Sequence, residues 1–509
     1  MNSLLPLIQL FLLLIPFCLL ISKMKQNRNK NGEAKGLPPG PMKLPLIGNL
    51  HQLGNLPHRS LQVLAEQHGP IMFLKLGSIP TLVVSSADIA REIFKTYDVI
   101  FSERPVLYAA KKLSYNCSAM SFSPYGEYWR EIKKIMMLEL LGGKRVRTFQ
   151  AVRDEEVGVL IEKIACSSDN NVNLSELTLS LSNSVICRVA FGKKYDEDGD
   201  EEDVNGRKSR FQEILQETQE LLGGFCLSDF FPSLSWINKF NGLEARLDKC
   251  FRELDSFYDK VIEEHLDLKR VKDDEEEDFV DVLLRVQKDP NKTISLTNDQ
   301  IKGVITDIFI AGTDTSAATL GWIMAELIKN PSAMKRAQDE VRTIAKGKGK
   351  VEESDLSKLK YLKSVIKEGF RLHPPVPLLV PRETTESFRI KGYLIPPKTR
   401  VFVNAKMIGN DPKFWENPNE FKPERFLESS VDYKGQHFEL LPFGAGRRRC
   451  PGLNFAELLV ELALANLLCR FDWKLPNGVE REDLDMEEAF GLTMHKRVPL
   501  RLEAVVVDP

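Results

Sequence analysis

A single cysteine in a glycine- and arginine-rich segment carries the clearest chemical signal in the sequence. Residues 443–452 read FGAGRRRCPG, so three arginines precede Cys450 and Pro451 follows it. Proline suits the first position of a helix, so a helix is expected to begin just after Cys450 and to include the apolar stretch 453–468. The helix start and the arginines favour a thiolate, which is a suitable axial ligand for haem iron. A buried structural cysteine is the alternative.

A second segment places a hydroxyl beside a carboxylate in an apolar helix. Residues 311–316 read AGTDTS, within a pattern that predicts a helix over 297–329. Thr315 beside Asp314 suits the delivery of protons to dioxygen. Gly312 is costly inside a helix, and the approach of a flat group or a small ligand to the backbone would explain it. A polar kink in a core helix is the alternative.

Two further pairs of side chains stand one helical turn apart. Glu368 and Arg371 lie in KEGFR, and an exposed ion pair of this kind is worth under about 1 kcal/mol. Arg425, in PERF, could share Glu368 with Arg371 in a partly buried network. Trp129 and Lys133 lie in YWREIKKI and, taken alone, form an ordinary amphipathic pair.

Together these segments resemble the sequence signature of the cytochrome P-450 superfamily. The segment at 443–452 matches F-x-x-G-x-R-x-C-x-G of the haem-binding loop, and AGTDTS matches the oxygen-activation motif. The resemblance implies that Cys450 ligates the iron of haem b (iron protoporphyrin IX). It assigns the hydroxyl role to Thr315 and the acid role to Asp314. It extends over nearly the whole chain and looks most like the plant A-type microsomal enzymes of specialised metabolism.

The resemblance also implies which residues hold the cofactor and its surroundings. The residues matched to cofactor contacts are Trp129, Lys133, Arg382, Phe443, Arg448 and Cys450. Lys133 stands where the family usually has arginine, so a point charge replaces a bidentate fork at the haem propionates. The residues matched to the triad that fixes the haem-binding core are Glu368, Arg371 and Arg425. These three are structural rather than catalytic.

Composition limits the other possibilities. The chain has 509 residues and a formal net charge of −2, which argues against a nucleic acid partner. Its eight cysteines show no CxxC or regular spacing, so neither a zinc site nor a disulfide framework is indicated. No long linker and no internal repeat divides the chain, which favours one large domain behind an N-terminal anchor.

The N-terminal residues predict a membrane anchor. Residues 4–21 carry no charge and would span roughly 27 Å as a helix, close to the thickness of a bilayer core. The basic residues after them belong on the cytosolic side. A cleaved signal peptide is the alternative, but no positive charge precedes the apolar run. We expect an anchor at 1–22, a basic patch and proline-rich hinge at 23–50, and a haem-thiolate catalytic domain at 51–509. The expected location is the endoplasmic reticulum membrane, with a single span and a cytosolic catalytic domain.

The expected fold is mainly α with a smaller β portion, the cytochrome P-450 fold behind a single transmembrane helix. The clearest helical patterns are 297–329 and 353–372, and the clearest strand patterns are 70–86 and 387–403. The second strand region is expected to be a strand pair with Pro396-Pro397 at a turn. The acidic runs at 196–203 and 273–278 are expected to be solvated loops.

The lead hypothesis is a membrane-anchored haem-thiolate monooxygenase. It would use O2 and electrons from NADPH-cytochrome reductase to oxygenate a small lipophilic metabolite, such as a terpenoid, phenolic, indole or alkaloid. The reductase is expected on a basic face that carries Lys133, Lys134, Lys144 and Arg447. The segments expected to line the substrate pocket are 101–120, 219–231, 308–311, 376–380 and 489–492.

Two alternatives of other kinds remain. A haem-thiolate isomerase or lyase uses no external electrons, and such relatives typically lack the threonine and the acid that are present here as Thr315 and Asp314. A non-catalytic haem carrier or sensor would leave a proton relay idle. The family also has a usual tryptophan at the position of Lys406, in VNAKMIG, and this departure by itself does not imply loss of activity.

Overall fold

The computed structural model describes residues 36–167, 171–195, 210–267, 270, 277–476 and 478–507. Within these ranges, no helix has both the length and the apolar character needed to span a membrane. The expected anchor at 1–22 and the acidic run at 196–203 lie outside the described residues.

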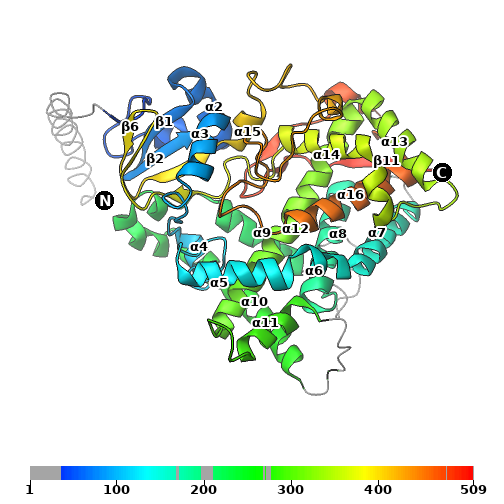
Figure 1. Cartoon of the computed structure of the whole chain (residues 1–509), viewed down its shortest axis with the longest axis horizontal. Helices are drawn as coiled ribbons and strands as arrows, with labels where there is room; N and C mark the ends of the chain where they lie inside the picture. The colour runs from blue at the N-terminus through cyan, green and yellow to red at the C-terminus, as the bar shows by residue number, and fades with distance from the viewer. Residues whose placement is uncertain are drawn as a thin grey trace, which may run out of the picture.

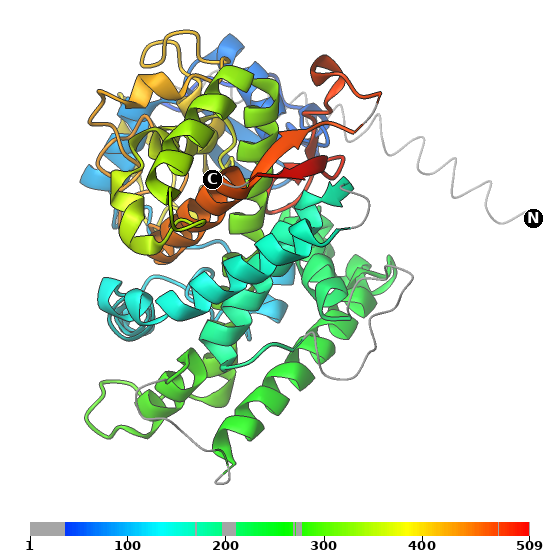
Figure 2. The ribbon, with the colours of Figure 1, turned by 90° about the vertical axis from the view of Figure 1, so that its right-hand side faces the viewer.

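Helices make up most of the described chain and strands a smaller part, as the sequence predicts; β1, β2 and β6 lie at one end of the molecule and β11 toward the other (Figure 1). The helices are α2 (Pro57–His68), α3 (Ala87–Arg91), α4 (Tyr108–Leu113), α5 (Glu127–Ile135), α6 (Gly143–Thr148), α7 (Gln150–Ala165), α8 (Leu174–Phe191), α9 (Arg210–Gly223), α10 (Leu243–Leu266), α11 (Phe279–Lys288), α12 (Asn298–Lys329), α13 (Pro331–Ala345), α14 (Lys360–Leu372), α15 (Ala405–Gly409) and α16 (Leu453–Arg470). The strands are β1 (Ile71–Leu76), β2 (Ile79–Val84), β3 (Asn171–Asn173), β4 (Arg382–Glu383), β5 (Phe388–Ile390), β6 (Tyr393–Ile395), β7 (Arg400–Val403), β8 (Phe471–Lys474), β9 (Glu488–Ala489), β10 (His495–Lys496) and β11 (Arg501–Val506). Figure 2 shows α10 and α11 (green) at the opposite end of the molecule from β1 and β2 (blue).

The larger sheet has the strand order β1-β2-β7-β4. Strands β1 and β2 form an antiparallel hairpin within the strand region predicted over 70–86, and β7 runs parallel to β2. The strand pair expected over 387–403 is instead three strands. β5 and β6 make a separate hairpin at Lys391-Gly392, where both residues have positive φ. Pro397 lies at the next turn, after which β7 joins the larger sheet.

Helix α12 is the longest described helix and matches its prediction within one residue. It begins with a capping box: the Thr297 hydroxyl accepts the Gln300 N–H at 3.2 Å, and the Gln300 side chain accepts the Thr297 N–H at 2.9 Å. It ends before Pro331, which disfavours helical geometry in the residue ahead of it. A Cβ on Gly312 would lie 2.5 Å from Ile186 Cδ1 of α8. Close packing of α8 therefore requires a glycine here, and the approach of a ligand to the backbone stays a prediction.

Two other helix predictions need correction. The region 353–372 divides at Leu359 into a short 3-10 helix, Glu353–Lys358, and α14. Pro451 and Gly452 form a turn, and α16 begins two residues later than Pro451 would suggest. Helix α16 is buried around most of its surface and packs against α7, α12 and α13 (Figure 1). The segment that carries Cys450 therefore leads directly into the core.

Candidate functional site

The chain before Cys450 forms a tight loop whose shape depends on two glycines. The Cys450 N–H donates to the Phe443 carbonyl at 3.0 Å and closes the loop. Gly444 and Gly446 have φ values of 64° and 71°, in the left-handed region that favours glycine. A Cβ on Gly446 would also lie 2.5 Å from Asp98 Oδ1. Cys450 is therefore held on a backbone turn that tolerates little change.

The positive charge near the Cys450 thiol does not offset the effect of its burial. Burial raises the pKa of Cys450, and a hydrogen bond from the Gly452 N–H and the charge of Arg449 act against this rise. Arg447 instead faces Asp98 at 3.5 Å, and Arg448 donates to backbone carbonyls, so these two arginines do not act as the sequence suggests. A metal ion would supply further positive charge, since a coordinating thiol is deprotonated.

One face of α12 is open at the middle of an otherwise buried helix. Between Ile301 and Ala325, the residues that are not buried are Asp307, Ala311, Gly312 and Thr315. Asp307, Ala311 and Thr315 are four residues apart and therefore share a face. Thr315 Oγ1 donates to the Ala311 carbonyl at 2.8 Å, which fixes the hydroxyl on this open stripe. Ala311 is exposed on this stripe and Thr315 is partly exposed, so the Thr315 hydroxyl is accessible.

The carboxylate of Asp314 has a different neighbour. Asp314 is buried, and its Oδ1 lies 2.7 Å from His495 Nε2 on β10. Its Oδ2 is buried without a hydrogen-bond partner among the described residues. The hydroxyl of Thr315 and the carboxylate of Asp314 thus make separate contacts, although they are adjacent in sequence. His495, 181 residues away from Asp314, is a site residue that the sequence interpretation did not identify.

Trp129 lies between two cations. Its indole N–H donates to the Met120 carbonyl at 3.2 Å. The Arg448 guanidinium carbon is 4.3 Å from the Trp129 ring centroid and Lys133 Nζ is 5.1 Å from it, both within the range of a cation–π interaction. Lys133 Nζ also donates to the Arg447 carbonyl. The lysine is therefore held by the protein itself, and Arg448 is the cation that lies closer to the indole.

Arg448 belongs to a group of three largely buried arginines with Arg104 and Arg382. Burial lowers the pKa of Arg382 to about 10. Burial, then the neighbouring Arg382, lowers the pKa of Arg448 to about 9. Burial, then Arg448 and Arg382, also lowers the pKa of Arg104. Most of their hydrogen bonds go to backbone carbonyls, which belong to Phe101, Ser102, Met120, Ser121, Ser123, Val380, Pro381 and Ala445.

These features fit haem b. Two propionate carboxylates would offset the mutual repulsion of three buried arginines, and arginine is well suited to pairing with carboxylates. The iron would supply further positive charge at the Cys450 thiol. The residues suited to hold the group are Cys450 at the iron, and Trp129, Arg104, Arg382 and Arg448 at the propionates. Phe443 packs edge-on against Phe370 of α14, with ring centroids 5.1 Å apart, and so ties the cysteine loop to that helix.

The network expected around Glu368 is present. Arg371 donates to both carboxylate oxygens of Glu368, at 2.7 and 2.8 Å, and Arg425 Nε donates to Glu368 Oε1 at 2.9 Å. Arg371 also donates to the carbonyls of Gly409 and Pro418, at 2.8 and 2.6 Å. The three side chains therefore join α14 to the segment before the cysteine loop.

The five segments expected to line the substrate pocket are linked by several contacts. The links are the hydrogen bond from Arg104 to the Val380 carbonyl (2.7 Å), that from Gln219 to the Ile310 carbonyl (3.5 Å), and the close packing of Gly223 on Leu492. Their roles toward a substrate remain a prediction.

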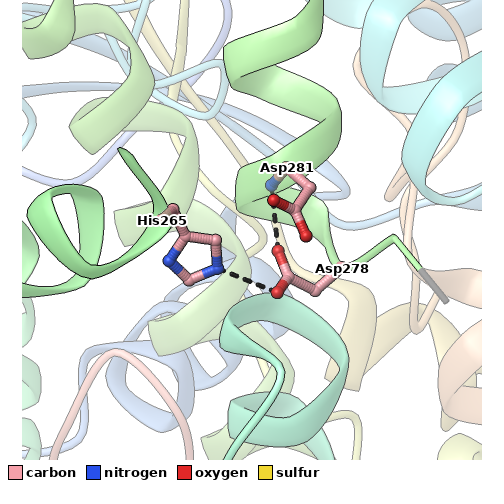
Figure 3. Close-up of side chains that lie close together, drawn as sticks. All are labelled: His265, Asp278 and Asp281. Atoms are coloured by element: carbon pink, nitrogen blue, oxygen red, sulfur yellow. Dashed lines mark hydrogen bonds and ion pairs between the residues drawn. The ribbon is translucent and has the colours of Figure 1, made fainter. Parts of the chain in front are cut away.

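A second buried cluster has the residue types of a metal site (Figure 3). His265 Nε2 lies 2.8 Å from Asp278 Oδ2, and Asp278 Oδ1 accepts the Asp281 N–H at 2.9 Å as the N-cap of α11. Arg270 bridges the two carboxylates, at 2.7 Å from Asp278 and 3.0 Å from Asp281. A guanidinium cation already occupies this position, so the cluster is an ion-pair network. Its burial also corrects the expectation that the whole run 273–278 is solvated.

Comparison with known proteins agrees with this geometry. The sequence model described as Cytochrome P-450 matches residues 38–500. The chain belongs to the cytochrome P-450 family.

Three similar cytochromes P-450 come from plants. It is 63% identical over 487 residues to cytochrome P-450 71A9 of Glycine max, which covers 95% of this chain and 96% of the relative. It is 59% identical over 500 residues to strychnine-11-hydroxylase of Strychnos nux-vomica, which covers 97% of each chain. It is 46% identical over 495 residues to phenylacetaldehyde oxime monooxygenase CYP71AN24 of Prunus mume, which covers 96% of this chain and 92% of the relative.

The comparisons confirm the family, the enzyme class and the cofactor predicted from the sequence. The protein is a cytochrome P-450 monooxygenase of the plant A-type, and its cofactor is haem b. Enzymes of this family use O2, a redox partner and small-molecule substrates. The sequence interpretation missed Arg104 and His495. Arg104 lies in the tripeptide ERP, where no spacing to another charged residue marks it as part of a site.

Proposed function

We propose that this cytochrome P-450 is a reductase-dependent monooxygenase of small lipophilic plant metabolites. One atom of O2 enters the substrate, and the other leaves as water with two protons and two electrons. NADPH-cytochrome reductase supplies the electrons. The observation that carries the proposal is the open stripe on α12, where the Thr315 hydroxyl is held at 2.8 Å from the Ala311 carbonyl. An isomerase or lyase without external electrons has no need for such a hydroxyl beside the acid Asp314.

Each residue of the site has a separate task. Bound haem supplies the chemistry that activates oxygen. Cys450 Sγ would ligate the iron, and the arginine group with Trp129 would hold the propionates. Thr315 Oγ1 holds a proton at the open stripe, and the Asp314 carboxyl replaces that proton when it is used. Both proton roles are proposals that rest on side-chain type and position.

The reductase docks on the basic face near Cys450. A cavity of about 280 Å³ opens there, and its lining includes Lys95, Lys133, Arg449 and Cys450. Lys134, Lys144 and Arg447 are exposed, whereas Lys133 is engaged with Trp129 and the Arg447 carbonyl. Lys134 and Lys144 are therefore the better test of docking. Charge reversal at both should slow reduction by the reductase most strongly at low salt, and an unchanged rate would count against this surface.

The proposed substrates are small lipophilic compounds. Terpenoids, phenolics, indoles and alkaloids are the candidates. The name strychnine-11-hydroxylase belongs to a relative of 59% identity, which favours testing alkaloids first.

We also propose that residues 1–22 anchor the enzyme in the endoplasmic reticulum membrane, with the catalytic domain at 51–509 in the cytosol. Two contacts of the hinge at 23–50 support a fixed attachment to this domain. The Phe73 N–H of β1 donates to the Pro39 carbonyl at 2.9 Å, and the Asn49 N–H donates to the Lys75 carbonyl at 2.6 Å. The proline-rich segment thus lies along the edge of the larger sheet.

The function is tested in microsomes that contain this protein and a plant reductase. A panel of alkaloids, indoles, phenolics and terpenoids is incubated with and without NADPH. Oxygenated product that appears only with NADPH supports the proposal. Product without NADPH would indicate an isomerase or lyase, and haem binding without turnover of any compound would favour a carrier or sensor.

A further inference from the structure

The acid of α12 is tied to the short hairpin of β9 and β10. His495 on β10 lies directly opposite Ala489 on β9. The Met494 carbonyl, next to His495, accepts the Trp322 indole N–H at 2.8 Å, and the Met494 N–H donates to the Pro375 carbonyl at 2.9 Å. These bonds fix the backbone on the N-terminal side of His495. The imidazole is thereby placed 2.7 Å from Asp314 Oδ1.

Exposure differs sharply across this pair. The Asp314 side chain is 8% exposed, whereas the His495 side chain is 39% exposed. Asp314 Oδ1 bonds to the imidazole, and Asp314 Oδ2 is buried without a partner among the described residues. One carboxylate oxygen of Asp314 thus contacts the partly exposed imidazole ring of His495. The other oxygen is available to accept another hydrogen bond.

We propose that His495 is the positioning residue that orients Asp314 and through which Asp314 exchanges protons. The inference rests on the proton role proposed for Asp314 above. It adds a residue from the strand that pairs with β9, next to the segment 489–492 that is expected to line the substrate pocket.

The charges around the ring support this exchange. Burial opposes the charged ring, but the charge and hydrogen bond of Asp314 outweigh it and raise the pKa of His495. Lys496, the next residue, donates to the Asp485 carbonyl and lies over the Trp322 ring. Glu488, opposite Lys496 on β9, instead contacts His58, Arg59 and Lys406. Asp314 is therefore the charged group that faces His495.

The proton balance of the step is simple. The imidazolium Nε2–H passes its proton to the Asp314 carboxylate at Oδ1, and the carboxyl group so formed gives a proton toward the reacting oxygen. The neutral ring then takes up a proton from water at its exposed edge. One proton moves inward each time this step takes place, and His495 is neither oxidised nor reduced.

The pairing can be measured without turnover. Hydrogen exchange at histidine C2, followed by mass spectrometry over a pH series, reports the pKa of each histidine in the full-length, haem-loaded enzyme. We expect Asp314→Asn to lower the pKa of His495 by about one unit. His437, paired with Asp432 at 3.4 Å elsewhere, is the internal control and should not change. An unchanged pKa of His495 in the variant would overturn the proposed pairing.

The exchange role is tested by comparing His495→Gln with Asp314→Asn. His495→Gln should reduce the product formed per NADPH consumed on the order of tenfold. It should also alter the pH dependence of this ratio, because a general acid or base acts only in one protonation state. Turnover driven by hydrogen peroxide, which already carries two protons and two electrons, should be largely retained. His51→Gln, at an exposed histidine, is the control and should behave like the wild type.

The outcomes separate this inference from the function on which it rests. A fall in coupling (product formed per NADPH consumed) in both Asp314→Asn and His495→Gln, with peroxide-driven turnover retained, supports the relay of protons from His495 to Asp314. Loss in Asp314→Asn alone would overturn the role of His495 and leave that of Asp314 intact. Normal coupling in Asp314→Asn would overturn the proton role of Asp314 itself. Equal loss of NADPH-driven and peroxide-driven turnover in His495→Gln would mean a structural defect and would also overturn the relay.

Discussion

Glu368 and Arg371 share two hydrogen bonds, of 2.7 and 2.8 Å, where neither side chain has exposed surface. Arg425 adds a third bond to the same carboxylate. Removing one partner of a buried ion pair leaves an uncompensated charge, which costs about 3–5 kcal/mol. Glu368→Gln should therefore lower the free energy of unfolding by this amount or prevent haem incorporation altogether. Chemical denaturation of the purified protein measures the change.

The matched control is an exposed pair of similar spacing. Asp339 and Lys335 lie 3.4 Å apart on α13, with side chains 60% and 78% exposed. Asp339→Asn should change the free energy of unfolding by less than about 1 kcal/mol. Equal effects of Asp339→Asn and Glu368→Gln would contradict the structural role of the triad.

The arginine group and Lys133 should differ in how strongly they retain haem. Arg448 lies 4.3 Å from the Trp129 ring centroid, against 5.1 Å for Lys133, and it belongs to the group of three largely buried arginines, whereas Lys133 does not. We expect Arg448→Leu to speed haem loss at least several-fold more than Lys133→Ala. Transfer of haem to an excess of an apo-globin measures both rates. A larger effect of Lys133→Ala would reverse the assignment of the main propionate contact.

Cys450→Ser should abolish the thiolate ligation and the monooxygenase activity while the fold is retained. Serine is a poor ligand for iron compared with a thiolate, and the loop geometry depends on the backbone bond to Phe443 and on two glycines rather than on sulfur. The haem absorption spectrum with carbon monoxide and circular dichroism measure the two effects. Cys166→Ser, at an exposed free cysteine, is the control. Normal turnover by Cys450→Ser would contradict the assignment of Cys450 as the iron ligand.

Stability should depend on pH through Glu461 of α16. Burial raises the pKa of Glu461 from 4.5 to about 7, despite Lys363 at 3.5 Å. The folded state thus binds more protons than the unfolded state between these values, so its stability is highest below them and falls as the pH rises. The loss is on the order of 3 kcal/mol. Urea denaturation of the wild type and Glu461→Gln at a series of pH values should show a fall over this range in the wild type only. Parallel curves of unfolding free energy against pH for the wild type and Glu461→Gln would contradict the raised pKa of Glu461.

Local patterns predicted some of these features and could not predict others. Glu368 and Arg371 are three residues apart, so helix geometry alone brings them together. The contact of Arg425 with Glu368 was predicted from the match of Arg425 to a family motif, not from helix geometry. Arg104 reaches the Val380 carbonyl across 276 residues and His495 reaches Asp314 across 181, and no spacing rule connects such positions.

Contacts between residues far apart in the sequence also explain what the sequence interpretation missed at Gly312 and Asp278. Gly312 was interpreted from its own helix, but its neighbour is Ile186 of α8, which only tertiary packing brings close. Asp278 was assigned to a solvated acidic run because composition alone favours exposure. Its burial depends on two residues that lie 13 and 8 positions away: His265, which makes a hydrogen bond, and Arg270, which supplies the compensating charge.

The most direct test of the central claim uses isotopically labelled dioxygen. Microsomes with this protein and a plant reductase are incubated under labelled O2 with NADPH and an accepted substrate, and the product is analysed by mass spectrometry. A monooxygenase predicts one labelled oxygen atom per hydroxylation and no product when NADPH is omitted. Product without the label, or product in the absence of NADPH, would contradict the account.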